Sequence, residues 1–349
     1  MGAMTELVLV ANAADSTIST FRVDTAAQPP TLERLAVSEV GEGCGTFAID
    51  ADRDLVYAAA KGDPPGIDVF ALDRETGRLE HLDHTDVEGS MSYLALAHGG
   101  SLLVGASYGG GNAQVFPVGD EGHVEEPTAQ VHWPNAHCVA LAGDGRHLYV
   151  VSLGADVVAQ YSLSPGGGLT PLVPPTAQAP DGSGPRHLVL DADEEHAYVM
   201  TEFSGEALTY ARDASGDLTL SGSVPAYAQD RGLRHSELGA DPVEGHLIWG
   251  ADLHLARQGT YLLASERSES TLASLPVAPD GSLGEAVSIV GTVAQPRGFL
   301  VLSDDRYALV TGEQDTAVAL VAVDEAGLLM EVARAETGNG ANWARSVQL

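Results

Sequence analysis

The sequence contains a single lysine, Lys61, within a total of 17 basic residues, against 49 acidic residues, so its formal net charge is −32. Nucleic acids and anionic membrane surfaces are bound by clustered Lys and Arg side chains, which this chain can hardly supply. We therefore expect neither a nucleic-acid nor a membrane partner. An anionic small molecule could bind only where the few arginines are concentrated.

Cysteines and long apolar runs are also scarce. The two cysteines, Cys44 and Cys138, are too few for a disulfide framework or a thiolate metal cage. No apolar run approaches the roughly 18 residues of a membrane span, and the first residues, MGAMTELVLVANA, lack a basic leader followed by a long apolar core. We expect a cytoplasmic protein in which residues 1–6 are a tag or a disordered start.

The chain does contain a repeat of short β-rich segments separated by turns with Asp, Gly or Asn. Equivalent positions in the second strand of each copy are Val8, Val56, Leu103, Tyr149, Tyr198, Leu262 and Ala308. The spacings are 48, 47, 46, 49, 64 and 46 residues, and the one long spacing indicates an insertion near residues 225–249, either an extra hairpin or a long loop. Four-stranded units at this period are typical of propeller blades.

The two ends of the chain complement each other. The first copy, LVLVANAADSTISTFRV from Leu7, lacks an innermost strand, whereas the chain ends in ANWARSVQL, which reads as that strand alone. Sharing one blade between the ends closes a ring and leaves no open sheet edge. The sequence therefore predicts an all-β fold, a seven-bladed β-propeller formed by residues 1–349 as one domain.

In such a ring, the start of each innermost strand and the end of each second strand lie on the same face, beside the central channel. Three of the sixteen arginines fall there, together with a histidine and a glutamate. The residues expected at or near this channel mouth include Tyr108, His137, Arg186, His187, Glu202, Asp252, His254, Arg267 and Arg297.

Each of these residues also has a purely structural interpretation. His137 could be a hydrogen-bonded residue at a strand start, and Arg267 with Glu202 could be a salt bridge between blades. Strand alternation predicts that His187 points away from Arg186 and is structural. Their convergence on one mouth favours a functional site that binds an anion and holds an acid/base pair.

Several segments resemble the seven-bladed lactonase family, which includes propeller 6-phosphogluconolactonases and carboxy-cis,cis-muconate cyclases. The segments that carry the resemblance are SYGGGNAQVFPV (107–118), PNAHCVALAGDGRHLYVVSLGAD (134–156), GPRHL (184–188), TEF (201–203), ADLHL (251–255), SER (265–267) and QPRGF (295–299). The resemblance extends from residue 7 to residue 349 and supports the same fold.

The resemblance implies an active site of one His, two Arg and one Glu, which fall on His137, Arg186, Arg267 and Glu202. Substrate-binding positions are then expected at Arg297, Tyr108, Asp252, His254 and His187. The chain departs from the family pattern at Asn135, Ser152, Thr201 and Glu266, so we expect the same chemistry in an altered substrate pocket.

The resulting prediction is a hydrolase that opens a sugar-derived lactone without a metal or other cofactor. Glu202 or His137 would be the general base, and Arg186 and Arg267 would bind the oxyanion or the substrate anion. The alternatives are a carboxy-muconate lactonising cyclase on the same scaffold and a non-enzymatic ligand-binding propeller. The sequence leaves open which lactone is used, whether it is phosphorylated, and the oligomeric state.

Overall fold

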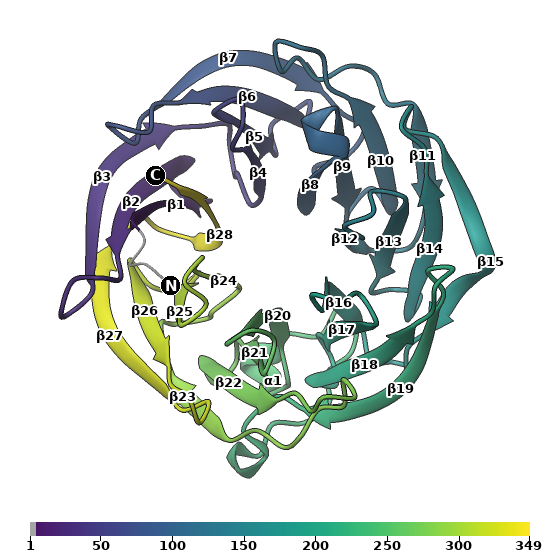
Figure 1. Ribbon diagram of the computed structural model, residues 1–349, viewed down its shortest axis with the longest axis vertical. Helices are drawn as coiled ribbons and strands as arrows, with labels where there is room; N and C mark the ends of the chain where they lie inside the picture. The colour runs from purple at the N-terminus through teal and green to yellow at the C-terminus, as the bar shows by residue number, and fades with distance from the viewer. Residues whose placement is uncertain (1–4) are drawn as a thin grey trace.

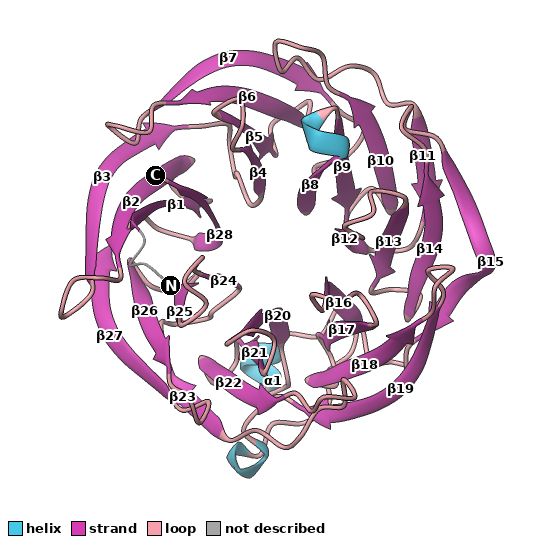
Figure 2. Cartoon of the chain, viewed as in Figure 1, coloured by secondary structure: helices cyan, strands magenta, loops and turns pink. Residues whose placement is uncertain are grey.

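Seven four-stranded antiparallel sheets stand around a central channel in the computed structural model, which describes residues 5–349 (Figure 1). Strands dominate the described chain, and its helices are single short turns (Figure 2). These are η1 (His98–Gly100), η2 (Gln229–Arg231) and α1 (Pro242–Gly245). The predicted all-β, seven-bladed propeller is confirmed, and each of the seven anchor positions lies on the second strand of its blade.

The strands of each blade follow one another from the channel outward. The first three blades are β28 (Ala341–Gln348), β1 (Thr5–Asn12), β2 (Thr17–Asp24) and β3 (Thr31–Glu39); β4 (Phe47–Asp50), β5 (Leu55–Ala60), β6 (Gly66–Leu72) and β7 (Leu79–Asp86); and β8 (Tyr93–Ala97), β9 (Leu102–Ser107), β10 (Asn112–Pro117) and β11 (Ala129–His132).

The other four blades follow in chain order. They are β12 (Ala136–Leu141), β13 (His147–Ser152), β14 (Val157–Leu163) and β15 (Leu169–Gln178); β16 (Pro185–Leu190), β17 (His196–Thr201), β18 (Glu206–Arg212) and β19 (Leu218–Pro225); β20 (Gly250–Ala256), β21 (Tyr261–Glu266), β22 (Thr271–Pro276) and β23 (Ser288–Gly291); and β24 (Gly298–Val301), β25 (Tyr307–Thr311), β26 (Ala317–Val323) and β27 (Leu329–Glu336).

The polarity of each strand matches its distance from the channel. The second strand β5, with the sequence LVYAAA, is buried along its whole length, because neighbouring blades cover both of its faces. The outermost strand β7, with the sequence LEHLDHTD, contains only intermediate and exposed residues. A continuous apolar run followed by a polar strand is thus the local pattern that builds a blade.

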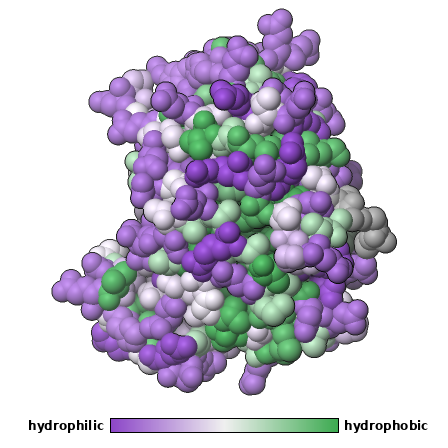
Figure 3. Space-filling model, turned by 90° about the vertical axis from the view of Figure 1, so that its left-hand side faces the viewer, coloured by the Kyte–Doolittle hydropathy of each residue, from purple (hydrophilic) through white to green (hydrophobic). Residues whose placement is uncertain are grey.

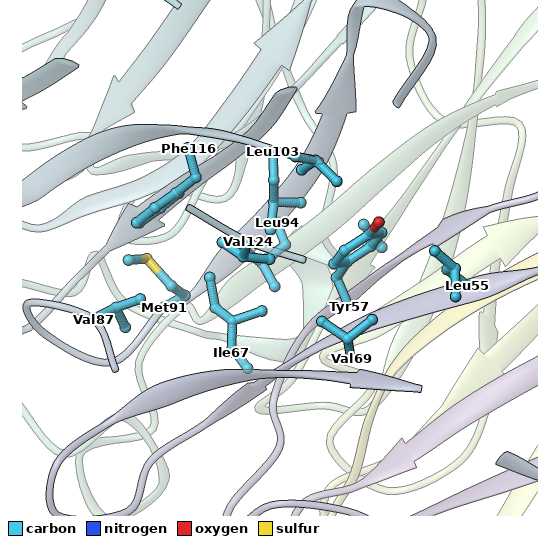
Figure 4. Packing of buried hydrophobic residues seen from close by; sticks show 13 residues of the cluster. Leu55, Tyr57, Ile67, Val69, Val87, Met91, Leu94, Leu103, Phe116 and Val124 are labelled. Atoms are coloured by element: carbon cyan, nitrogen blue, oxygen red, sulfur yellow. The ribbon is translucent and has the colours of Figure 1, made fainter. Parts of the chain in front are cut away.

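The hydrophobic core lies between blades. In one such cluster, Tyr57 and Ile67 of one blade pack against Leu94, Leu103 and Phe116 of the next (Figure 4). A sheet of this kind buries each face against a neighbour, so no blade has a complete core of its own. On the flank of the ring shown in Figure 3, hydrophilic residues cover most of the surface and hydrophobic patches lie between them.

The chain ends share one blade, as predicted. Strand β28 pairs antiparallel with β1, from Glu6 opposite Gln348 to Asn12 opposite Ala341. The Trp343 Nε1–H donates to the carbonyl of Phe47 in the neighbouring blade, at 3.1 Å. This closure is confirmed, and it places the start of β28 at the channel.

The insertion between β19 and β20 is a long loop rather than an extra hairpin. It contains η2 and α1, and the Asp241 carboxylate caps α1 by accepting the N–H groups of Val243 and Glu244. The loop ends at Trp249, directly before β20.

Residues 1–6 were predicted to be a tag or a disordered start, and the structure describes only the last two of them. Thr5 and Glu6 belong to β1, and the remainder of residues 1–6 lies outside the described chain. Within residues 5–349, no helix has the length and apolar character needed to cross a membrane.

Candidate active site

A pocket of about 310 Å³ opens at the channel mouth, where innermost strands begin and second strands end, and all seven blades contribute to its wall. This volume lies within the range of small-molecule sites. Of the residues predicted from the sequence, those that line the pocket are Tyr108, His137, Glu202, Arg267 and Arg297.

At one side of the pocket, two guanidinium groups hold the same carboxylate oxygen. Arg186 Nε donates to Glu202 Oε2 at 2.9 Å, and Arg267 Nη2 donates to the same oxygen at 2.9 Å. The second oxygen, Oε1, accepts no hydrogen bond from any residue of the described chain. Glu202 therefore presents one fixed oxygen and one free oxygen at the pocket wall.

The charge of Glu202 is set by these partners. Burial alone would raise the pKa of the carboxyl, but the positive charges of Arg267, Arg186 and Arg297 outweigh burial and lower the pKa below its ordinary value. Glu202 is therefore a carboxylate at neutral pH, a form that can accept a proton. Burial lowers the pKa of Arg267 to about 9, so this guanidinium stays charged.

Arg267 is fixed by contacts on several sides. Its guanidinium carbon lies 3.8 Å from the centre of the Trp249 ring, and the guanidinium donates to the carbonyls of Trp249 and Gly250. An arginine held in this way loses little conformational freedom when it binds a substrate oxygen. The insertion thus contributes to the site through Trp249, its last residue.

Arg186 lies beneath the pocket wall rather than in it. It is 1% exposed, and its Nη1 donates to the carbonyl of Ala251 at 2.6 Å and to His187 Nε2 at 3.2 Å. Since these partners and Glu202 are all protein groups, Arg186 serves in this structure to position Glu202.

His187 and Asp252 support Arg186 from below. Burial lowers the pKa of His187 to about 4, against the opposing pull of Asp252, so the ring is neutral. Its Nδ1–H donates to Asp252 Oδ1 at 2.6 Å, which leaves Nε2 as the acceptor for Arg186. Asp252 also contacts His254 Nε2 at 3.3 Å.

The expectation that His187 points away from Arg186 is wrong. The pairing of β16 with β17 skips Arg186, since Pro185 lies opposite Thr201 and His187 lies opposite Met200. This β-bulge breaks the alternation of side chains, so neighbouring residues can meet. His187, Asp252 and His254 are absent from the pocket wall, so the structure gives none of them a place against a substrate in the pocket.

Three further inner strands carry the same irregularity. Register shifts occur between Ala136 and Cys138 in β12, between Gly250 and Leu253 in β20, and between Ala341 and Trp343 in β28. The bulges therefore include the positions of His137, Asp252 and Asn342. Bulges commonly aim side chains in this way beside active sites.

His137 lies against this layer and faces the pocket. It is 4% exposed, its ring centre is 5.1 Å from that of His187, and its Nδ1 is buried without a hydrogen-bond partner in the described chain. Burial, followed by the charge of Arg186, holds the pKa of His137 well below its ordinary value. His137 is therefore a neutral imidazole at neutral pH.

Arg297 and Tyr108 complete the predicted part of the wall. Arg297 Nη1 donates to Glu313 Oε1 at 2.9 Å. The ring of Tyr108 meets that of His137 edge-on, with centres 5.9 Å apart, and burial raises the pKa of its hydroxyl. Tyr108 is therefore a neutral hydroxyl that can donate a hydrogen bond.

The wall residues that the sequence analysis missed include Lys61, Trp249 and Asn342. The innermost strand of the shared blade, β28, begins at Ala341. Asn342 takes the place at the mouth, and Arg345 stacks on Trp343 with its guanidinium carbon 4.1 Å from the ring centre.

Another hollow, of about 370 Å³, lies on the opposite face between turns of two blades. Its lining contains charges of both signs, and Arg306 pairs there with Asp304 at 3.0 Å. Within residues 5–349, no group of three or more His, Cys, Asp or Glu residues is arranged to hold a metal ion.

Comparison with known families gives one match that covers nearly the whole chain. Residues 2–345 match the model of the family described as lactonase, 7-bladed β-propeller. A curated 6-phosphogluconolactonase of Serratia proteamaculans is 27% identical over 345 residues, covering 97% of this chain and 98% of that protein. One of Klebsiella pneumoniae is 26% identical over 302 residues, covering 85% and 86%.

Solved structures share the fold. A protein of Bacteroides fragilis superposes with a TM-score of 0.87 at 24% identity, covering 99% of this chain and 98% of that one. The periplasmic gluconolactonase of Pseudomonas aeruginosa gives a TM-score of 0.83 at 23% identity, covering 98% and 99%.

Proposed function

This chain belongs to the lactonase family of seven-bladed β-propellers, and from that premise we propose that it hydrolyses a sugar-derived lactone of the 6-phosphogluconolactone type, without a metal ion, at the channel mouth. The observation that carries the assignment is Glu202, an ionised carboxylate held by Arg186 and Arg267 in a pocket that also contains Arg297. The curated relatives named 6-phosphogluconolactonase support the substrate class.

Hydrolysis begins with water in the pocket. Glu202 Oε1 accepts a proton as the water oxygen bonds to the lactone carbonyl carbon, and the carbonyl oxygen becomes an oxyanion. Arg267 and Arg297, which line the same pocket, stabilise that negative charge. The carbon–oxygen bond of the ring then breaks, and the ring oxygen takes the proton from Glu202 as it leaves. The product is an open-chain hydroxy acid.

In this assignment Glu202 is the base, and the neutral His137 orients the water or the leaving oxygen by hydrogen bonding. The choice rests on protonation, because Glu202 is ionised and has an oxygen free of protein partners. Arg186 acts by holding Glu202 in place. Tyr108 is a hydrogen-bond donor for a substrate hydroxyl.

The test is a rapid assay of phosphorylated and unphosphorylated δ-lactones of sugar acids, since such lactones also open spontaneously. We expect Glu202→Gln to lower kcat by about 10²- to 10⁴-fold and His137→Ala to lower it less. Glu285→Gln is the matched control, because Glu285 is exposed and far from the mouth.

A carboxylated muconate belongs in the same panel. Lactone formed from it at an enzymatic rate would identify the cyclase alternative instead. Failure of every lactone and of the muconate would favour a non-enzymatic propeller, and wild-type rates in both site variants would place the chemistry elsewhere. Activity should survive a chelator such as EDTA, because we assign each step to protein side chains.

We also propose that the protein acts in the cytoplasm. Cys44 and Cys138 are both buried and unpaired, as suits a reducing compartment. Fractionation of the source cells tests this, and recovery outside the cytoplasm would contradict it.

A further inference from the structure

Charge is distributed unevenly among the outermost strands of the blades. The outermost strands of three consecutive blades, β27, β3 and β7, contain seven acidic residues between them. Those of the other four blades, β11, β15, β19 and β23, contain no Asp, Glu, Lys or Arg (Figure 1). One continuous part of the flank therefore has uncharged outer strands, although the net charge of the chain is −32.

Strand β15, within this part, has a longer bulge than the other outer strands. Its pairing with β14 moves from Thr176 to Pro171 across one residue of β14, Gln160, so that four residues, 172–175, lie opposite Gln160. The bulges in β3, β7, β19 and β27 each insert one residue. A bulge leaves its residues unpaired and bends the strand, so residues 172–175 interrupt the regular edge of this blade.

The backbone of the bulge is fixed by Gln160, whose side chain is fully buried behind it. The Gln160 Nε2–H donates to the carbonyl of Pro174 at 3.1 Å, and Gln160 Oε1 accepts the N–H of Leu218 in β19 at 2.7 Å. The bulge is thus held both to its own blade and to the next one. A segment fixed in this way has little conformational freedom left to lose when it binds a partner.

The surface of the bulge is apolar and open to solvent. Val173 is 89% exposed, the highest value among the exposed large hydrophobic side chains of residues 5–349, and Pro171, Pro174 and Pro175 are exposed beside it. Since proline has no N–H, these positions offer no donor to an added β-strand. The bulge therefore suits packing of side chains against another protein surface.

The charge of the molecule indicates which partner fits this surface. A basic partner would be attracted to the acidic strands β27, β3 and β7, and the uncharged strands would offer it no such attraction. Two copies of this chain, each with a net charge of −32, repel each other and can approach most closely where neither presents charge. A twofold interface places a patch against itself, and an apolar patch is complementary to itself whereas an acidic patch is not.

The size of the uncharged surface is sufficient for such a contact. Strands β11, β15 and β19 contain 4, 10 and 8 residues, and a standard interface takes about 20–30 residues from each partner. We propose that the protein forms a twofold homodimer, with the β15 bulge at the centre of the interface and uncharged strands on either side. The dimer does not depend on the proposed function, because the pocket at the channel mouth is lined by none of these strands.

Sedimentation velocity of the full chain tests the dimer. We expect a reversible monomer–dimer equilibrium at protein concentrations of about 1–100 μM, the range of a small interface. Val173→Glu, which places a charge at the centre of the contact, should weaken association by about 10- to 100-fold. Val37→Glu is the matched control, because Val37 is 53% exposed on the acidic strand β3, and it should leave the dissociation constant within about twofold of wild type. Thermal melting checks that both variants are folded.

Salt distinguishes this interface from one held by ion pairs. Raising NaCl from about 0.15 to 1 M should tighten association about threefold or more, because screening weakens the repulsion between copies. A monomer at every protein and salt concentration would overturn the proposal, as would a dimer that Val173→Glu weakens no more than Val37→Glu does. A dimer that Val173→Glu disrupts, in a protein that opens no lactone, would uphold this interface and reject only the proposed function.

Discussion

The protonation states of Glu202 and His137 are determined by their neighbours. Arginines lower the pKa of Glu202 against the effect of burial, and burial lowers that of His137. Both groups therefore lose their protons at a lower pH than the free side chains, and neither should change its charge between pH 6 and 8.

This gives a pH prediction. With an unphosphorylated lactone, whose own charge is constant, kcat/KM corrected for spontaneous opening should stay flat from about pH 8 down to about pH 5. It should fall only below the ordinary Glu value of 4.5, because protonation of Glu202 removes the base. An inflection above about pH 5 would contradict Glu202 as the base.

Asp252 is predicted to act through His187 and Arg186. In Asp252→Asn, the Nδ1–H of His187 loses its charged acceptor, and Arg186 loses its fixed position under Glu202. We expect kcat to fall by about 10- to 100-fold with little change in KM, and the acid limb of the pH profile to move upward as the clamp on Glu202 loosens.

His254→Gln is the control for that variant, since glutamine keeps a donor for Asp252, and its kcat should stay within about twofold of wild type. A merely structural Asp252 would give a less stable protein with an unmoved acid limb. Denaturant melting of both variants separates the two outcomes.

At this scale the repeat found part of the site. Tyr108, Glu202 and Arg267 each directly follow the second strand of a blade, and Lys61 directly follows the second strand LVYAAA in the same way. The repeat therefore contained the signal for Lys61, which the sequence analysis missed. Asn342 was missed because the residues expected at the channel mouth included none from the C-terminal strand ANWARSVQL. Trp249 could not be placed from the repeat, because it belongs to the insertion.

Among the elements, the inner strands decide where the site residues point. The alternation of apolar residues predicts the strands themselves, but not the register shifts at β12, β16, β20 and β28. A bulge inserts one residue into the pairing without altering the apolar pattern around it. The sequence therefore placed Arg186 and His187 at the mouth and gave the wrong orientation for His187.

Gly250, at the bulge in β20, allows two blades to approach closely. A Cβ there would clash with the carbonyl oxygen of Thr201, and the Gly250 N–H donates to the carbonyl of Glu202 at 2.9 Å. We expect Gly250→Ala to lower the free energy of unfolding by about 1–3 kcal/mol and to lower kcat, because Glu202 and Arg267 are displaced together.

Urea denaturation with a parallel lactone assay checks this. Gly222→Ala in β19 is the matched control, since a Cβ there meets no atom within 4 Å, and its effect should stay within about 0.5 kcal/mol. Equal stability of the two variants would show that the contact between β20 and β17 is not tight.

At the scale of the whole molecule, the sequence was most informative. Seven copies at a near-constant spacing, with complementary ends, predict a closed ring, and β28 pairs with β1 as that closure requires. Blade number and closure follow from features that recur along the whole chain. The bulges recur at the start of several inner strands, but they leave the apolar pattern of each copy unchanged, so the repeat does not reveal them.

The net charge of −32 predicts opposite effects of salt on the fold and on the pocket. Raising NaCl from about 0.05 to 1 M shortens the Debye length to about 3 Å, which weakens repulsion among the surface carboxylates and should raise Tm by several degrees. Choline chloride should act alike if ionic strength is the cause. A Tm that falls with salt would show that self-repulsion does not limit stability.

Within the same salt series, the KM for a phosphorylated lactone should rise. The pocket wall contains Lys61, Arg267 and Arg297 against the single carboxylate Glu202, so the excess positive charge lies in the pocket while the rest of the surface is acidic. A KM for the phosphorylated lactone that falls with salt would show that long-range repulsion by the acidic surface outweighs attraction by Lys61 and Arg297.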